Sequence, residues 1–131
     1  MYVIGGWLGS GTFASSDLYI LNLDISEWSH SMTSGQSPGP CNMHSAEVVD
    51  NFIYIFRGGD GKDYLNDLHR FDTLSMSWAL INTLGTPPPP RANHCSALLK
   101  RNLYIFGGWD GQKRLNDLYF YNIDSNVWQE V

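Results

Sequence analysis

Charged residues, and basic ones above all, are scarce in this chain of 131 residues. Lys and Arg number 8 against 13 for Asp and Glu, which gives a formal net charge of −5. A protein that follows a phosphate backbone needs a basic surface, so nucleic-acid binding is not expected. No apolar run approaches the roughly 18 residues of a membrane-spanning helix, so we expect no membrane insertion. No basic segment followed by an apolar one opens the chain, so no signal peptide is predicted.

Cysteine is scarce as well. Cys41 and Cys95 are the only two, and they lack the Cys-x-x-Cys spacing of a redox or zinc motif. Two cysteines are also too few for a disulfide framework, and no Asn-x-Ser/Thr glycosylation site occurs. These absences favour a reducing, intracellular compartment, and we expect a cytoplasmic protein. The chain also shows no helical period, although 43% hydrophobic residues suffice for a packed core.

What the sequence does contain is an internal repeat with a period of 50 residues. Three Asp-Leu pairs, three tryptophans and two histidines recur at this one offset. They are Asp17-Leu18, Asp67-Leu68 and Asp117-Leu118; Trp28, Trp78 and Trp128; and His44 and His94. The triplet Tyr-Ile-Phe at 54–56 also recurs at 104–106. So many matches at a constant offset indicate duplicated structural units.

Each repeat has the pattern of four short strands, named a to d in chain order. Strand a is expected at 45–49 and 95–99, strand b at 52–56 and 103–106, and strand c at 18–23, 68–72 and 118–123, while strand d holds the tryptophan. Strand b is a continuous apolar run, which is typical of a strand buried on both faces. The glycines and aspartates that follow it are turn residues. An all-β fold is therefore predicted.

The order of these features resembles the kelch repeat: strand b, Gly-Gly, a loop, Asn-Asp-Leu, a spaced Trp and then Pro-Arg-x-x-His. The segment 85–94 is similar to the subgroup with a Gly-x-x-Pro-x-x-Arg-x-x-His motif before strand a. That subgroup includes the kelch domains of the leucine-zipper-like regulator and the Rab9 effector. The resemblance covers residues 1–131 and implies kelch-type β-propeller blades of four antiparallel strands.

On this division the chain holds about two and three-quarter blades. The first covers 1–34 and lacks strand a, the second covers 35–84 and the third covers 85–131. A propeller closes with 4–8 blades, and stacked repeats depend on their neighbours to bury a core. We therefore expect the remaining blades to come from a longer chain of about six blades, or from self-association of copies into a ring.

The repeat is broken at two places. Arg57 stands where the third copy has the first glycine of Gly-Gly, and Gly59 stands where it has Trp109. Cys41 occupies the position of Arg91. The first b–c loop is also two residues longer than the third. Function is expected where the period breaks, at 57–59, in this long first loop and in the d–a links.

Strand direction predicts the partner-binding face. In a four-stranded meander, strands a and c run opposite to b and d, so the b–c loops and the d–a links share one face. Irregular loops on a rigid scaffold are where binding residues concentrate. We expect this face to bind a partner protein, with an acidic peptide or loop held by arginine forks and aromatic anchors. The candidate residues are Phe13, Arg57, Lys62, Tyr64, Arg91, Trp109, Lys113 and Arg114.

A protein–protein interaction module, acting as adaptor or scaffold, is the function that these features favour, and no enzyme activity is expected. Two alternatives stay open. One is a propeller enzyme of galactose-oxidase type, which would hold copper near the axis through His, Tyr and a Tyr–Cys cross-link. The other is a purely structural scaffold for an attached domain, such as a ubiquitin-ligase adaptor.

No cofactor or metal is expected. The repeated His44 and His94 are interpreted as hydrogen-bonding residues that open strand a, because no third or fourth ligand is spaced to join them. His30 and His69 do not repeat and are expected at the surface.

Overall fold

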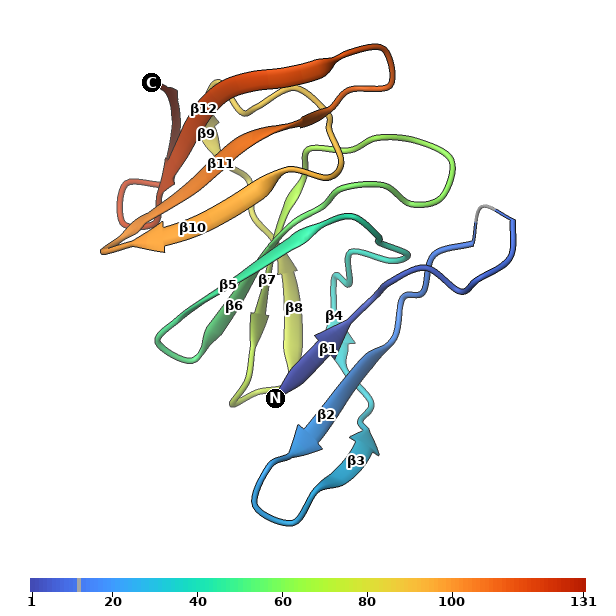
Figure 1. The fold of residues 1–131 in the computed structure, drawn as a ribbon. Coiled ribbons are helices and arrows are strands. Elements are labelled where there is room, and N and C mark those ends of the chain that lie inside the picture. The colour runs from blue at the N-terminus through green and yellow to red at the C-terminus, as the bar shows by residue number, and fades with distance from the viewer. Residues whose placement is uncertain (12) are drawn as a thin grey trace.

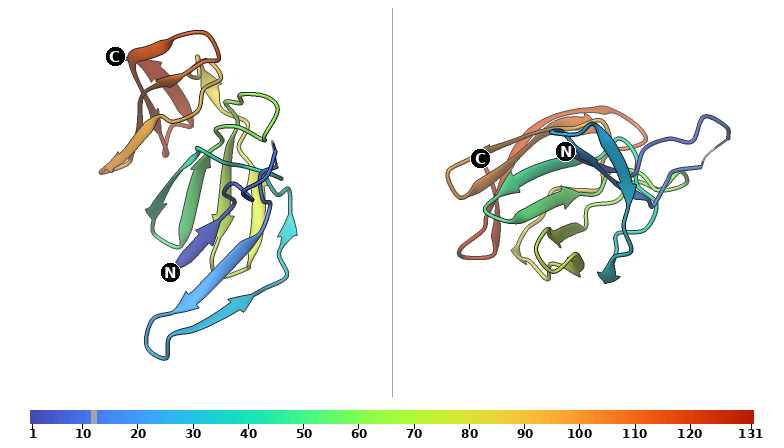
Figure 2. Two further views of the ribbon diagram at one scale, coloured as in Figure 1. Left: turned by 45° about the vertical axis from the view of Figure 1, so that its right-hand side comes forward. Right: turned by 90° about the horizontal axis from the view of Figure 1, so that it is seen from below.

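The computed structural model describes residues 1–11 and 13–131, and it is all-β over these ranges, as predicted. Three sheets follow one another in chain order and fan out side by side (Figures 1 and 2). Within the described ranges there is no helix that is long and apolar enough to cross a bilayer.

The first sheet has three antiparallel strands in the order β1-β2-β3: β1 (Tyr2–Ile4), β2 (Leu18–Asn22) and β3 (Glu27–His30). They correspond to the predicted strands b, c and d of the first blade. Strand c ends one residue earlier than expected.

The second and third sheets repeat one plan with five strands each. The second has the order β4-β8-β7-β6-β5, with β4 (Ser34–Gly35), β5 (Ser45–Val49), β6 (Phe52–Phe56), β7 (Leu68–Asp72) and β8 (Ser77–Leu80). The third has the order β10-β11-β12-β13-β9, with β9 (Leu84–Gly85), β10 (Cys95–Leu99), β11 (Asn102–Trp109), β12 (Arg114–Asn122) and β13 (Val127–Glu130). Strands β11 and β12 are longer than predicted because they pair beyond a bulge between Phe106 and Gly108.

The fifth strand of each sheet was not predicted. The link from the preceding blade contributes it: β4 runs parallel to β8, and β9 runs parallel to β13. Gly35 and Gly85 have φ of 82° and 76°, and a Cβ atom there would lie 2.1 Å and 2.3 Å from the carbonyl oxygens of Trp78 and Trp128. The glycine of the Gly-x-x-Pro motif is therefore required by close backbone approach.

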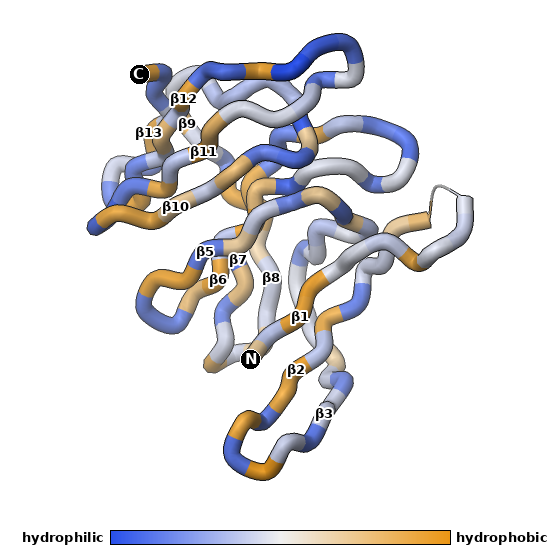
Figure 3. Tube along the Cα trace, viewed as in Figure 1, coloured by the Kyte–Doolittle hydropathy of each residue, from blue (hydrophilic) through white to orange (hydrophobic). Residues whose placement is uncertain are grey.

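The core lies between neighbouring sheets. Trp128 is 2% exposed and packs edge-to-face on Phe56 of the second blade, with ring centroids 5.7 Å apart. Trp78 is 6% exposed and packs on Phe71 of its own sheet, in a cluster that also includes Leu18 of the first blade. Trp28 has no blade beyond it in this chain and is 57% exposed. In contrast to this apolar core, the β6–β7 and β11–β12 loops are rich in hydrophilic residues (Figure 3).

The inner strands β5 and β10 lie next to each other, and the second repeated histidine joins them. The ring of His94 is buried, with its Nε2 2.8 Å from the hydroxyl oxygen of Ser45. Burial, together with the nearby Arg91 and His44, lowers the pKa of His94 to about 4. The expected hydrogen-bonding role at the start of strand a is therefore seen at His94.

The expectation of a surface position was wrong for His69. Its side chain is buried on β7, with Nε2 2.6 Å from an Asp67 carboxylate oxygen and Nδ1 3.3 Å from the carbonyl oxygen of Gln36. A buried imidazole needs such partners, and the link before β5 supplies one of them. His30 is exposed, as expected.

Substituting Trp128 should cost much more stability than substituting Trp28. Trp128→Ala removes a fully buried indole, and we expect the free energy of unfolding to fall by about 3–5 kcal/mol. Trp28→Ala removes the equivalent but exposed side chain and should cost less than about 1 kcal/mol. Chemical denaturation of both variants measures the difference. Similar losses of unfolding free energy in the two would contradict the burial of Trp128 between the blades.

Stability should decrease as the pH is lowered from about 6.5 toward 4. The pKa of His94 is lowered in the folded state, so in this window the unfolded chain binds more protons than the folded one. The contribution is fully present above about 6.5 and is lost as the pH falls to about 4. Denaturation at a series of pH values should show a smaller decrease for His94→Gln, and equal pH profiles would refute the assignment.

Candidate functional site

The b–c loops and the d–a links lie on one side of the molecule, as the strand directions predicted (Figure 1). We call this side the loop face; it comprises residues 5–11, 13–17, 36–44, 57–67, 86–94 and 109–114. The tight a–b and c–d turns lie on the opposite side, which we call the turn face. The two faces therefore differ in kind: the first offers long irregular segments and the second short hairpin connections.

Aspartates hold the tips of two loops on the loop face. An oxygen of the Asp60 carboxylate accepts hydrogen bonds from the backbone N–H groups of Asp63 and Lys62, both at 2.8 Å. Asp110 accepts the same pair of bonds in the third blade, from Lys113 and Gln112. These bonds lower the pKa of both carboxyls below the usual range. The second and third loops thus share one preorganised turn that presents a lysine.

A pocket of about 160 Å³ lies between the first and second loops. Trp7 lines one side of it, and Lys62 and Tyr64 line another. Trp7 is 61% exposed, and its indole N–H donates to the carbonyl oxygen of Gly11 at 3.2 Å. The structure therefore brings the predicted Lys62 and Tyr64 together with a tryptophan that the sequence reasoning missed.

A second pocket of about 460 Å³ lies beside the third loop. It is lined by Trp109 and Arg114, with Asn93 from the link on the other side. Trp7 and Trp109 both follow a Gly-Gly pair directly, and this shared position was the signal that could have identified Trp7.

The remaining candidates lie at the outer surface. Phe13 is 66% exposed, next to the similarly exposed Leu8, and Lys113 is exposed at the tip of the third loop. The first loop thus exposes the apolar side chains of Leu8 and Phe13, whereas the third loop exposes the cation of Lys113.

Arg91 is not available to a partner, so its place among the binding residues was wrong. Its side chain is 0% exposed, and both terminal nitrogens donate hydrogen bonds to the Asp117 carboxylate. The distance from Nη2 to Oδ2 is 2.8 Å. It also donates to the carbonyl oxygens of Gly107 at 2.9 Å and Pro89 at 3.0 Å. These bonds hold the pKa of the Asp117 carboxyl below its usual range. Arg91 ties the link to the start of strand c.

Arg57 performs the same task in the second blade from a different chain position. Its guanidinium donates to the carbonyl oxygen of Pro40 at 3.1 Å and to Asp67, the counterpart of Asp117, at 3.4 Å. The Arg57 side chain is only 16% exposed. Cys41, at the position of Arg91, is fully buried, and burial raises the pKa of its thiol to about 11.

The departures at Arg57 and Cys41 are therefore one exchange. In the third blade Arg91 reaches the aspartate over a glycine, Gly107. In the second blade the arginine comes from the glycine position, and the small Cys41 leaves room for it. Arg57 belongs to the scaffold beneath the loop face, with its donors already used inside the blade.

Restoring the third-blade arrangement in the second blade should rescue a damaging substitution. Arg57→Gly leaves Asp67 without its guanidinium, and Cys41→Arg places a second one in the same space. We expect each alone to lower the free energy of unfolding by roughly 1–3 kcal/mol. The double variant should lie within about 1 kcal/mol of the parent, which denaturation of all four proteins measures. Additive losses would show that the two positions are independent.

Within the described ranges, no three side chains of His, Cys, Asp or Glu are grouped in a way that could hold a metal ion.

Comparison with known proteins agrees with this architecture. The family model of the KLHDC2/KLHL20/DRC7 Kelch-repeats domain matches residues 1–131. The chain is 41% identical over 58 residues to host cell factor 2 of Homo sapiens, which covers 44% of this chain and 7% of that protein. It is 33% identical over 73 residues to the Drosophila melanogaster homolog of leucine-zipper-like transcriptional regulator 1. That match covers 52% of this chain and 8% of that protein.

A third relative is kelch domain-containing protein 3 of Mus musculus, which is 36% identical over 66 residues, covering 49% of this chain and 17% of that protein. The matches thus span less than a fifth of each of these relatives. The repeated blades, the buried tryptophans and the match over the full chain lead to one conclusion: this chain belongs to the kelch-repeat family.

Proposed function

We propose that this chain is a protein–protein interaction module, an adaptor or scaffold that binds a partner segment through its loop face. The observation that carries the proposal is the pair of pockets in which a tryptophan lies beside a cation, Trp7 with Lys62 and Trp109 with Arg114. Tryptophan and arginine are the residue types that dominate binding energy at protein interfaces. Loop tips fixed by Asp60 and Asp110 lower the ordering cost of such binding.

The chemistry of the loop face suits a segment that combines acidic and apolar side chains. Lys62, Lys113 and Arg114 are exposed cations that can pair with carboxylates. Trp7 and Phe13 offer exposed aromatic surface for apolar residues of the same segment. Arg91 and Arg57 act through the scaffold and are not part of the proposed contact surface.

We further propose that additional blades cover the two outer faces of this array. Phe106 is 49% exposed, whereas its counterpart Phe56 is completely buried beneath the third blade. Trp28, the counterpart of Trp128 at the other end, is 57% exposed. A longer chain of about six blades would bury both, in line with the 4–8 blades of closed propellers. A reducing, cytoplasmic setting belongs to this proposal, because Cys95 is exposed as a free cysteine.

Peptides selected from a displayed random library test the proposed face. We expect the selected peptides to combine Asp or Glu with apolar residues and to bind less tightly as salt concentration rises. Reversing three loop-face charges together, with Lys62→Glu, Lys113→Glu and Arg114→Glu, should weaken their binding by about tenfold or more. The control is Lys100→Glu, which reverses the charge of an exposed residue on the turn face. It should leave the affinity for the selected peptides unchanged.

Two results would contradict the proposal. Selected peptides could lack any preference for acidic residues, or they could bind the triple variant as tightly as the parent. Circular dichroism and thermal unfolding of the variants establish that the comparison is made between folded proteins.

A further inference from the structure

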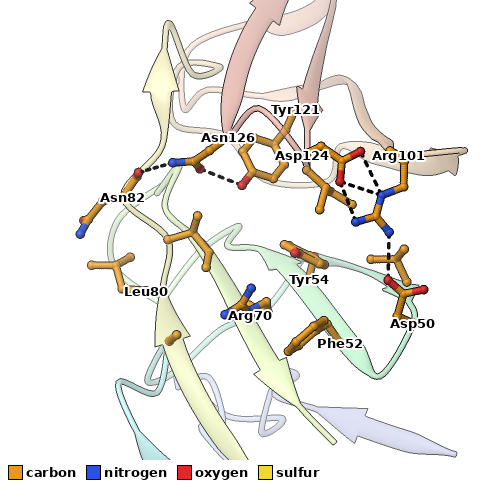
Figure 4. A pocket seen from close by; sticks show the side chains of 14 residues that line it. Asp50, Phe52, Tyr54, Arg70, Leu80, Asn82, Arg101, Tyr121, Asp124 and Asn126 are labelled. Carbon is orange, nitrogen blue, oxygen red and sulfur yellow. Dashed lines mark hydrogen bonds and ion pairs between the residues drawn. The ribbon is translucent and has the colours of Figure 1, made fainter.

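A third pocket, of about 520 Å³, lies at the seam between the second and third blades on the turn face. Figure 4 shows Phe52, Tyr54 and Arg70 on the side of the second blade, facing Tyr121 and Asn126 on the side of the third. Arg101 and Asp124 close one end, and Asn82 lies at the other. None of these residues belongs to the loop face.

The equivalent seam between the first and second blades is apolar at its centre. Ile20 and Met76 pack there against the fully buried Phe71, in one hydrophobic cluster. The seam is closed further by Tyr2, whose ring lies 6.1 Å from that of Phe71. This is the arrangement expected where two sheets are held together by packing alone.

All three central positions change to polar residues in the second seam. By the 50-residue repeat, Ile20 becomes Arg70, Phe71 becomes Tyr121 and Met76 becomes Asn126. Replacing packed apolar groups by polar ones costs stability unless new partners satisfy them. Three such changes lie in the one seam that holds this pocket, and they point to an interaction beyond the scaffold.

Most polar groups of the pocket are satisfied inside the protein. The Tyr121 hydroxyl donates to Asn126 Oδ1, and Asn126 Nδ2 donates to the carbonyl oxygen of Asn82, both at 2.8 Å. Arg101 bridges Asp50 and Asp124 at 2.9 Å each. Burial raises the pKa of Tyr121 to about 12, so its hydroxyl adds no negative charge at neutral pH.

Arg70 is the exception. Its guanidinium carbon lies 4.3 Å from the centre of the Phe52 ring, which holds the side chain in place over an aromatic face. Among the described residues no hydrogen bond or ion pair engages its side chain. A guanidinium fixed in this way presents its donors to the pocket in a planar fork that matches a carboxylate.

We propose that this pocket binds a monocarboxylate ligand, with Arg70 as the residue that recognises the carboxylate. One free cation matches one negative charge, whereas Asp50 and Asp124 at the rim oppose a doubly charged phosphate. The partly exposed side chains of Phe52, Leu80 and Ile123 offer apolar surface for the carbon skeleton of the ligand, and the buried rings of Tyr54 and Tyr121 lie behind them. The carboxylate can belong to a free organic acid or to an Asp or Glu side chain of a partner.

Titration with phenylacetate, followed by NMR of the arginine Nε–H signals of the full chain, tests the proposal. We expect a saturable shift of the Arg70 signal. Phenylacetamide, which has the same shape without the charge, and phenyl phosphate should each bind at least tenfold more weakly. A blocked Ala-Glu-Ala peptide distinguishes the source: tighter binding than phenylacetate assigns a partner side chain, and weaker binding assigns a free acid.

Arg70→Ile supplies a variant in which loss of binding cannot come from loss of the fold. It restores the residue of the first seam, so we expect a melting temperature equal to or above that of the parent and binding reduced at least tenfold. Arg70→Gln should lose binding as well, while Arg114→Gln on the loop face should retain it. The proposal is overturned if Arg70→Ile binds phenylacetate as the parent does, or if phenylacetamide or phenyl phosphate binds equally well. Neither result bears on the loop face, because no residue of that face is altered in Arg70→Ile.

Discussion

Trp128 lies between two sheets that pair no strands with each other, so neighbouring blades are held together by side chains: chiefly by apolar packing, with the hydrogen bond between His94 and Ser45 and the ion pair of Arg101 with Asp50 beside it. The indole fills the space against Phe56 of the neighbouring sheet, with ring centroids 5.7 Å apart. Because the packing fixes the angle between blades, it also fixes the distance between one b–c loop and the next. The pocket between the first and second loops spans one such pair of neighbouring blades.

The arginines of the scaffold show how a repeat can conserve an interaction without conserving a residue position. Asp67 and Asp117 occupy equivalent places, and each is paired with a guanidinium. The guanidinium comes from the start of the b–c loop in one blade and from the link in the other. What the fold requires is a cation at one point in space, and either of two backbone positions can deliver it.

Much of the fold followed from the sequence because the 50-residue period carries the strands, the turns and the buried tryptophans together. The loop face followed from strand direction alone. The role of Arg91 could not be read in this way, since a cation on a surface loop and a cation buried over Tyr119 look identical in sequence. The free guanidinium of Arg70 escaped notice for a related reason: only the structure shows that its neighbours Arg101 and Asn126 are already engaged.

The strand that each link adds to the following sheet has a consequence for synthesis. β9 pairs with β13, so Leu84 and Gly85 find their backbone partners only at residues 127 and 128. As the chain leaves the ribosome, this segment waits through the whole of the next repeat before it can be fixed. Folding from the N-terminus therefore lags behind translation by about one blade. During synthesis, the link synthesised last has not yet formed its backbone hydrogen bonds to the following blade.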